Sequence, residues 1–198
     1  MATDGVAAYW DDQAATFDDA ADHGLRDPSV RRAWRALLGS VLPEAPAEIA
    51  DLGCGTGSLS LLMAEAGHRV SGIDVSDRMV AAAQAKADLA HISTTFRQGD
   101  AAEPKLAPDS IDVIVVRHVT WALPDPGAAV ARWRTILRDA GRLVLIEGQW
   151  STGVGLKASQ LEAIVRPTFP NIETSPLTDP QLWGGPITDE RYLLVASV

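Results

Sequence analysis

The clearest alternation of apolar and polar residues begins at Asp27-Pro28, where apolar side chains start to recur with helical spacing. This pair is a typical helix start, because the aspartate can cap free backbone N–H groups and proline suits the first helical position. Pro43 and Pro46 end the pattern. We therefore predict an amphipathic helix with one buried stripe, which consists of Val30, Ala33, Trp34, Leu37, Leu38 and Val41.

Short apolar runs and helical patterns then alternate along the chain. The run Ile111–Val116 is almost entirely β-branched, which is typical of a strand that is covered on both faces. The predicted strands are Glu48–Leu52, Arg69–Asp74, Thr94–Gln98, Ile111–Val116 and Leu143–Ile146. The predicted helices are Gly57–Ala66, Asp77–Asp88 and a third that starts at Asp125-Pro126 and ends at Gly141. Strands that alternate with helices through short connections predict an α/β fold with a parallel sheet.

The two ends of the chain are less regular. The first 27 residues are polar, rich in Asp and Ala, and predict no clear element. Near the other end, Gln160–Val165 suits a short helix, a short strand starts at Ile172, and Arg191–Val198 suits a final apolar strand. No linker or repeat divides the chain. We therefore predict one domain over residues 1–198, with residues 1–44 as an N-terminal helical segment that contributes to the cleft.

Composition and charge exclude several classes of protein. The chain has 198 residues and a formal net charge of −9, so we expect no nucleic-acid partner, because phosphate-binding proteins usually carry a basic surface. No apolar stretch approaches the roughly 18–20 residues that span a bilayer, and the N-terminus lacks a secretory leader pattern. We expect a cytoplasmic protein without a membrane partner. The single cysteine, Cys54, excludes an intrachain disulfide, and we expect no metal site.

Three alternating glycines follow the first predicted strand, in the segment D-L-G-C-G-T-G over residues 51–57. Glycine lets the backbone bend sharply and approach a ligand closely, although a tight strand-to-helix turn alone would also use it. The dinucleotide pattern G-x-G-x-x-G is not met, because Ser58 stands where its third glycine would be. Asp51 would also repel a pyrophosphate and attract a ligand that carries a positive amino group. The turn therefore favours a cationic amino compound attached to a nucleoside.

Two further acidic residues follow the next predicted strands. Asp74 ends the second strand, where a carboxylate can accept hydrogen bonds from both hydroxyls of an unphosphorylated ribose. Asp100 follows the third strand, in Gly99-Asp100-Ala101, where it can accept a hydrogen bond from an adenine amino group. Carboxylates at three successive strand ends favour ligand binding, because unpaired buried charge is costly. Solvated loop carboxylates are the alternative, most of all for Asp100.

These motifs resemble those of the class I S-adenosylmethionine-dependent methyltransferases, over roughly residues 45–150. The similarity is greatest to the small-molecule branch that includes ubiquinone and menaquinone biosynthesis methyltransferases. The resemblance implies a Rossmann-like seven-stranded sheet, mostly parallel with an antiparallel last strand and with helices on both faces. It also implies S-adenosyl-L-methionine as the cofactor and a small organic molecule as the methyl acceptor.

The resemblance also assigns roles to residues of the strand ends. It implies that the turn with Asp51, Gly53, Cys54, Gly55 and Gly57 lines the methionine end of the cofactor, and that Asp74 holds the ribose. It further implies contacts to adenine from Val75, Met79, Asp100 and Ala101, and a position beside the methionine moiety for Arg117. Tyr9 and Phe17 resemble the N-terminal aromatic residues that close over the cofactor in such enzymes.

Candidate residues for the acceptor side come from segments without a motif. His118 follows the fourth predicted strand and is the best candidate for a general base, while a loop histidine bonded to backbone is the alternative. His23 belongs to the segment that we expect to fold over the cleft. An apolar acceptor pocket could be walled by Trp121, Trp150 and Trp183, together with Trp10. Packing under long loops is the alternative for these tryptophans, whereas Trp34 and Trp133 lie on helix stripes and suit the core.

We therefore predict a class I methyltransferase that acts on a small molecule by in-line displacement. Because little chain remains for a large substrate-binding cap, we expect an open acceptor site or one that is completed by a second subunit in a homodimer. An NAD-dependent oxidoreductase is the first alternative, disfavoured by Asp51 and by the early third glycine. A non-catalytic nucleoside-binding module is the second alternative.

Overall fold

The apolar runs of the sequence form one seven-stranded sheet in the computed structural model, which describes residues 3–197. The strands are β1 (Glu48–Leu52), β2 (Arg69–Asp74), β3 (Thr95–Gln98), β4 (Ile111–Arg117), β5 (Leu137–Gln149), β6 (Asn171–Pro176) and β7 (Glu190–Ser197). Their order is β3-β2-β1-β4-β5-β7-β6. Strands β1 to β5 pair in parallel, whereas β7 pairs antiparallel with both β5 and β6. The predicted Rossmann-like sheet with an antiparallel last strand is confirmed.

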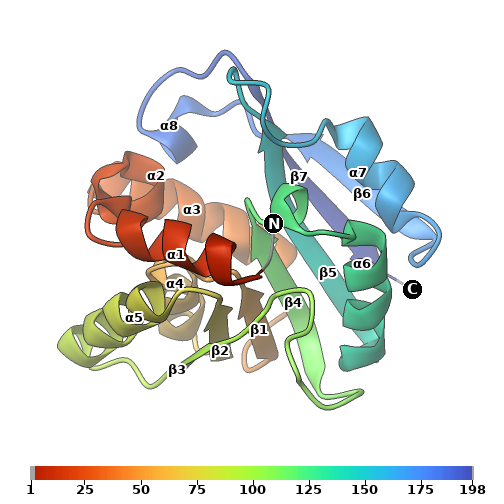
Figure 1. Ribbon diagram of the computed structural model, residues 1–198, viewed down its shortest axis with the longest axis horizontal. Helices are drawn as coiled ribbons and strands as arrows, with labels where there is room; N and C mark the ends of the chain where they lie inside the picture. Colours follow the sequence, from red (N-terminus) through yellow and green to blue (C-terminus); the bar gives the residue numbers. More distant parts are fainter. Residues whose placement is uncertain (1–2, 198) are drawn as a thin grey trace.

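Helices cover both faces of this sheet (Figure 1). They are α1 (Thr3–Gln13), α2 (Ala21–Gly24), α3 (Pro28–Val41), α4 (Ser58–Glu65), α5 (Asp77–Ala90), α6 (Pro126–Ile136), α7 (Ala158–Val165) and α8 (Pro180–Trp183), with 3-10 turns η1 (Phe17–Asp19) and η2 (Thr120–Ala122). Helices α3, α4 and α8 bury apolar side chains in one core, which contains Trp34. Helices α6 and α7 build the other core, which contains Trp133. Both tryptophans are fully buried, as predicted.

The helix starts that the sequence indicated are formed by side-chain caps. The Asp27 carboxylate accepts hydrogen bonds from the backbone N–H groups of Ser29 and Val30 at the start of α3. The Asp125 carboxylate accepts one from Ala128 N at the start of α6. Each cap satisfies N–H groups that the first helical turn leaves without an intrahelical partner, so these boundaries are set locally.

The segment between α6 and the main part of β5 differs from the sequence prediction. We expected the helix to run to Gly141, but α6 ends just before Leu137, which has extended backbone and starts β5. Leu137 is fully buried and pairs with Ile111, and the register between β4 and β5 shifts beyond this pair. A Cβ atom at Gly141 would lie 2.9 Å from the carbonyl oxygen of Arg138. Gly141 therefore permits an irregular strand rather than ending a helix.

The first part of the N-terminal segment, residues 3–27, for which the sequence predicted no clear element, contains α1, η1 and α2. Helix α1 contacts α5, and α2 contacts α8. Asp18 and Asp22 bind Thr56 and Arg117, so the segment lies against the ends of β1 and β4. The predicted final strand is β7, although its last predicted residue, Val198, lies outside the described residues, as do Met1 and Ala2. Within residues 3–197, no helix is long and apolar enough to cross a membrane.

Candidate functional site

The glycine turn between β1 and α4 has a backbone that requires glycine. Gly53, Gly55 and Gly57 have φ angles of +74°, +53° and +77°, in the left-handed region. A Cβ atom at Gly53 would lie 2.2 Å from Cγ2 of Val119, and one at Gly57 would lie 2.8 Å from Cβ of Ala83. The turn therefore needs glycine both for its backbone conformation and for its packing.

Two buried carboxylates lie at the ends of β1 and β2, beside this turn. Asp51 is 2% exposed and accepts a hydrogen bond from the Ser60 hydroxyl. The Asp74 carboxylate accepts hydrogen bonds from Gly55 N at 2.8 Å and from Ser76 N at 2.9 Å. Burial raises the pKa of Asp51 to about 6, and burial also raises the pKa of Asp74. These carboxylates would gain from a ligand that donates hydrogen bonds or carries positive charge.

The residues expected around adenine lie at the ends of β2 and β3. The Asp100 carboxylate accepts a hydrogen bond from Ala102 N at 2.8 Å, so it caps the turn after β3. Ala101 is buried and its carbonyl oxygen accepts a hydrogen bond from Trp133 Nε1. Val75 is half-buried, whereas Met79 is buried inside α5. Val75, Asp100 and Ala101 therefore lie directly after the strand ends, whereas the Met79 side chain is packed inside the protein next to them.

Cys54 lies inside the glycine turn, between Gly53 and Gly55. Burial, with the negative charges of Asp51 and Asp74, raises the pKa of its thiol well above the ordinary value. The thiol therefore stays protonated at neutral pH and is a poor nucleophile. Any role at this position comes from its backbone and its size.

The N-terminal segment is held to the glycine turn and to α5. The Asp11 carboxylate accepts hydrogen bonds from Ser76 Oγ and Arg78 N. The Asp18 carboxylate accepts a hydrogen bond from the Thr56 hydroxyl and forms an ion pair with Lys86 at 2.7 Å.

The aromatic ring of Phe17 lies directly over the glycine turn. Its nearest atom would be 3.1 Å from a Cβ atom at Gly55. Trp10 and Tyr9 extend the same aromatic group, since the Trp10 ring lies 6.1 Å from Phe17 and 5.1 Å from Tyr9. Trp10 therefore lies with the N-terminal aromatic residues, apart from the other tryptophans that the sequence placed at the acceptor.

Arg117, at the end of β4, is bound by the N-terminal segment. Its guanidinium donates to the Asp22 carboxylate and, at 2.7 Å, to the Asp22 carbonyl oxygen. It also lies over the Trp34 ring, 4.3 Å from the ring centre. The positive charge of Arg117 is thus placed next to the strand ends and is neutralised by Asp22.

His118 follows Arg117 with a φ angle of +59°, which is unusual for a residue other than glycine. Its ring lies edge-on to Trp150 at 5.0 Å and is stacked on Trp183 at 6.2 Å. Its Nε2 is buried and has no hydrogen-bond partner among residues 3–197. Burial, with the charge of Arg117, lowers the pKa of His118 well below its usual value. The imidazole is therefore neutral at physiological pH.

His23 lies close to His118, although the two residues are far apart in sequence. Ligand atoms of Asp22, His23 and His118 lie within 4.8 Å of one another. The Asp22 carboxylate is already paired with Arg117, which disfavours a cation at this cluster. The His23 ring stacks on Phe17 at 4.2 Å, and its Nδ1 is 3.2 Å from the Phe17 carbonyl oxygen. Burial lowers the pKa of His23, so a second neutral imidazole lies beside the first.

The other three tryptophans that the sequence analysis considered for the acceptor pocket form one group around His118. Trp121 is 36% exposed and lies 6.0 Å from Trp150, whereas Trp183 is 9% exposed and packs edge-on against Trp34. Arg191 lies over the rings of both Trp150 and Trp183, at 5.3 and 4.8 Å. The structure thus brings together three tryptophans that sequence reasoning selected one at a time.

Sequence reasoning missed Glu147, which is fully buried near the end of β5. Its Oε1 accepts hydrogen bonds from Val119 N at 2.9 Å and from the backbone N–H and hydroxyl of Thr120 at 2.8 and 2.6 Å. Its Oε2 has no partner among the described residues. The available signal was an acidic residue directly after the apolar run Leu143–Ile146, the same pattern that identified Asp51 and Asp74.

The raised pKa of the buried Glu147 leads us to expect that the stability of the protein changes with pH. Burial raises its pKa to about 7, above the ordinary value of 4.5, so the unfolded chain releases this proton first as the pH rises. The contribution of Glu147 to stability should therefore fall between about pH 4.5 and pH 7, by up to about 3 kcal/mol at 1.36 kcal/mol per pKa unit. Urea unfolding should show that the wild type loses stability relative to Glu147→Gln over this range. The exposed Glu173→Gln is the control, and a difference that does not change with pH contradicts the raised pKa.

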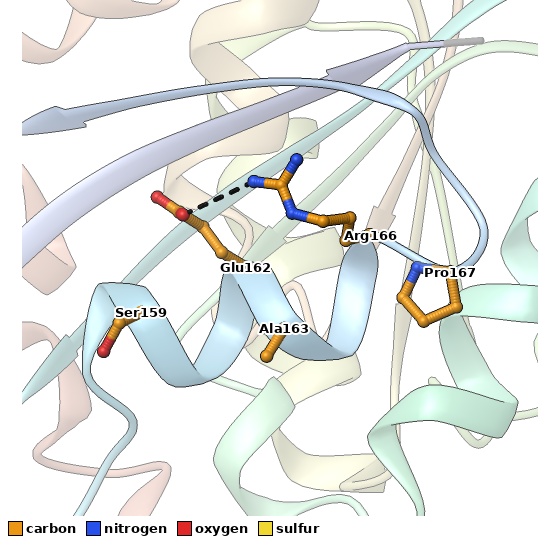
Figure 2. Close-up of a pocket in the computed structure, with 5 residues that line it drawn as sticks. All are labelled: Ser159, Glu162, Ala163, Arg166 and Pro167. Carbon is orange, nitrogen blue, oxygen red and sulfur yellow. Dashed lines mark ion pairs between the residues drawn. The ribbon is translucent and has the colours of Figure 1, made fainter.

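A surface depression of about 500 Å³ lies elsewhere, along α7 and the turn after it (Figure 2). Its lining residues all come from α7 and the two residues that follow it, and Glu162 and Arg166 form an ion pair at 3.7 Å. At the strand ends, polar groups from several elements converge, whereas at this depression they do not. The strand ends are therefore the candidate functional site.

Comparisons with known proteins match the part of the chain that contains these strand ends. Residues 50–145 match a family model described as a methyltransferase domain. A nocamycin O-methyltransferase from Saccharothrix syringae is 34% identical over 138 residues, which cover 68% of this chain and 48% of the relative. A ubiquinone/menaquinone biosynthesis C-methyltransferase from Rubrivivax gelatinosus is 30% identical over 135 residues, which cover 68% of this chain and 52% of the relative. The chain thus spans about half the length of these curated relatives.

A solved [4+2]-cyclase shares the fold, with a TM-score of 0.72, 18% sequence identity, and coverage of 84% of this chain and 79% of that chain. At this identity the likeness supports the fold alone. The matched family segment, in contrast, contains the glycine turn, Asp51, Asp74, Asp100 and Arg117. The chain therefore contains a methyltransferase domain of the class I S-adenosylmethionine-dependent type.

Proposed function

We propose that this chain binds S-adenosyl-L-methionine and transfers its methyl group to a small organic molecule. The observation that carries the proposal is the pair of buried carboxylates, Asp51 and Asp74, at adjacent strand ends around the glycine turn. Both have raised pKa values because burial disfavours their charged forms. Hydroxyl and ammonium donors would stabilise these charged forms, whereas a diphosphate would be repelled.

The residues of the turn fit the methionine and ribose parts of this cofactor. Asp51 would attract the amino group, and the left-handed backbone at Gly53 and Gly55 gives the turn its sharp bend beside the ends of β1 and β2. Asp74 would accept hydrogen bonds from the ribose hydroxyls while it keeps its bonds to Gly55 N and Ser76 N. Each carboxylate oxygen has capacity for more than one donor, so both sets of bonds are compatible.

The adenine would lie near the ends of β2 and β3. It would contact Val75 and Met79 on one side and the backbone around Asp100 and Ala101 on the other. We propose that Arg117 lies beside the methionine moiety. We further propose that residues 1–44 cover the cofactor, which the contacts of Asp11, Asp18 and Phe17 with the turn support.

Methyl transfer from this cofactor depends mainly on the positions of the two reactants. The sulfonium of the bound cofactor makes the methyl group electrophilic, and correct alignment for in-line attack can supply about 7–11 kcal/mol of the barrier. We propose that His118 accepts the acceptor's proton where the attacking atom carries one. Its neutral ring and its unpartnered Nε2 support this role.

We propose that the acceptor is a small, largely apolar molecule that lies against Trp121, Trp150 and Trp183 beside His118, with His23 contacting it from the N-terminal segment. The short distances among these rings support a single pocket wall. We also propose a cytoplasmic protein that acts without nucleic acid, in line with its net charge of −9. Sedimentation analysis would determine whether a second copy of the chain completes the site in a homodimer.

Isothermal titration tests the proposed cofactor directly. We expect S-adenosylmethionine and S-adenosylhomocysteine to bind with micromolar dissociation constants, and NADH to show no binding at the same concentrations, because Asp51 repels its diphosphate. Binding of NADH without binding of S-adenosylmethionine would favour an oxidoreductase and overturn the proposal. Binding of S-adenosylmethionine without methylation of any tested phenol, amine or acid would leave the nucleoside-binding module as the alternative function.

A further inference from the structure

The loop after β4 is attached to the rest of the sheet through the buried Glu147. Its Oε1 alone accepts three hydrogen bonds, and all three donors belong to two consecutive loop residues, Val119 and Thr120. The same face of β5 carries Leu143 and Leu145, both fully buried in the apolar core. An acidic residue in such a row is costly to bury, and its hydrogen bonds to the loop offset part of that cost.

The loop that Glu147 holds forms one side of the candidate site. Val119 packs against the glycine turn, since its Cγ2 would be 2.2 Å from a Cβ atom at Gly53. His118 directly precedes Val119 and presents its ring to Trp150 and Trp183. A displacement of the Val119 N–H group would therefore move both the wall of the glycine turn and the imidazole.

The backbone of His118 also needs external support. Its φ of +59° is unfavourable for a residue other than glycine, and such a conformation persists only where neighbouring contacts hold it. On its N-terminal side, His118 N donates to the Ile146 carbonyl oxygen. On its C-terminal side, the next two backbone N–H groups, those of Val119 and Thr120, donate hydrogen bonds to the Glu147 carboxylate. The residue is thus held from β5 on both sides.

We propose that Glu147 is a positioning residue, which fixes the loop of residues 118–120 so that His118 and Val119 face the cofactor and the acceptor. The consequence for catalysis rests on the proposed function, whereas the positioning of His118 does not. Glu147 acts through the loop and does not itself contact the reacting atoms. The charge of its carboxylate strengthens the three hydrogen bonds, because bonds to an ionised acceptor are stronger than bonds between neutral groups.

Three substitutions separate this role from a general contribution to packing. Glu147→Leu removes the acceptor and keeps a similar side-chain volume, Glu147→Gln keeps one oxygen acceptor, and Thr120→Val removes only the hydroxyl donor. Glu173→Gln, on the exposed part of β6, is the matched control. The readouts at pH 8 are the dissociation constant of S-adenosylhomocysteine by calorimetry and the Cε1–H nuclear magnetic resonance of His118, assigned with His118→Gln.

Glu147→Leu should shift the His118 resonance and weaken the binding of S-adenosylhomocysteine at least tenfold. Glu147→Gln should restore binding to within about threefold of the wild type, because its oxygen can accept the same donors. An unchanged His118 resonance in a folded Glu147→Leu protein overturns the proposal. Should Glu147→Leu not fold, a shifted resonance in Thr120→Val supports the positioning role, and no shift in that variant overturns it. If the wild type does not bind S-adenosylhomocysteine, the proposed function fails, while the His118 resonance still tests Glu147.

Discussion

Asp74→Ala should weaken the binding of S-adenosylhomocysteine by about 100-fold, which corresponds to a loss of about 3 kcal/mol. The substitution removes the buried carboxylate that we propose accepts hydrogen bonds from both ribose hydroxyls. It also removes the acceptor for Gly55 N and Ser76 N, so the glycine turn loses its connection to the end of β2. Calorimetric titration of the wild type and the variant measures the change.

The control for this experiment is Asp77→Ala. Asp77 is exposed in the first turn of α5, only three residues from Asp74, and its replacement should leave the dissociation constant within about twofold. Asp74→Asn should lie between the two, because its amide oxygen can replace one acceptor while its NH₂ group faces a backbone donor. A thermal melt confirms that each variant is folded. An unchanged dissociation constant in folded Asp74→Ala would contradict the assignment of Asp74 to the ribose.

Gly53→Ala should destabilise the protein by about 2–5 kcal/mol and abolish measurable binding of the cofactor. A residue with a Cβ atom in the left-handed region costs about 1–2 kcal/mol, and the new methyl group would also overlap Val119, which adds about 1–3 kcal/mol. The first cost follows from the φ of +74° at Gly53, and the second from the 2.2 Å distance between the new Cβ atom and Val119 Cγ2. Urea unfolding gives the stability, and titration with S-adenosylhomocysteine gives the binding.

Two further variants separate strain from overlap. Gly153→Ala has the same backbone requirement, with a φ of +84°, but open space around the new Cβ atom, so it should show the conformational cost alone. The double variant Gly53→Ala/Val119→Ala removes the overlapping side chain and should recover part of the lost stability. If the double variant recovers no stability, the overlap with Val119 contributes little to the destabilisation of Gly53→Ala, and the predicted cost of the overlap is wrong.

Local sequence patterns predicted most of the elements because their causes lie close together in the chain. The amphipathic stripe and the Asp27 cap define α3 from its own residues, and the β-branched run defines β4. Gly141 was assigned wrongly because a glycine after a helical pattern usually ends a helix. Here the burial of Leu137 against β4, a tertiary contact, starts the strand four residues earlier.

The candidate site divides in the same way. Asp51, the glycine turn and Asp74 were selected from the sequence, since each lies at the end of an apolar strand and the ends of parallel strands meet at one edge of a sheet. The residues proposed for the acceptor side could be selected only one at a time. His118 and His23 meet because α2 is held at the end of β4 by Arg117 and Asp22, which are 95 residues apart in the chain.

The amino-acid sequence by itself determined the α/β class, the parallel sheet and the glycine turn with its acidic residue. These features depend on periodicity and on residues within a few positions of one another. Only the tertiary structure revealed the path of the N-terminal segment, the group of tryptophans around His118 and the bonds from Glu147 to the loop after β4. These features depend on the free energy of contacts between distant segments. Such contacts leave no periodic trace in the chain, so they become visible only when the sheet brings its strand ends together.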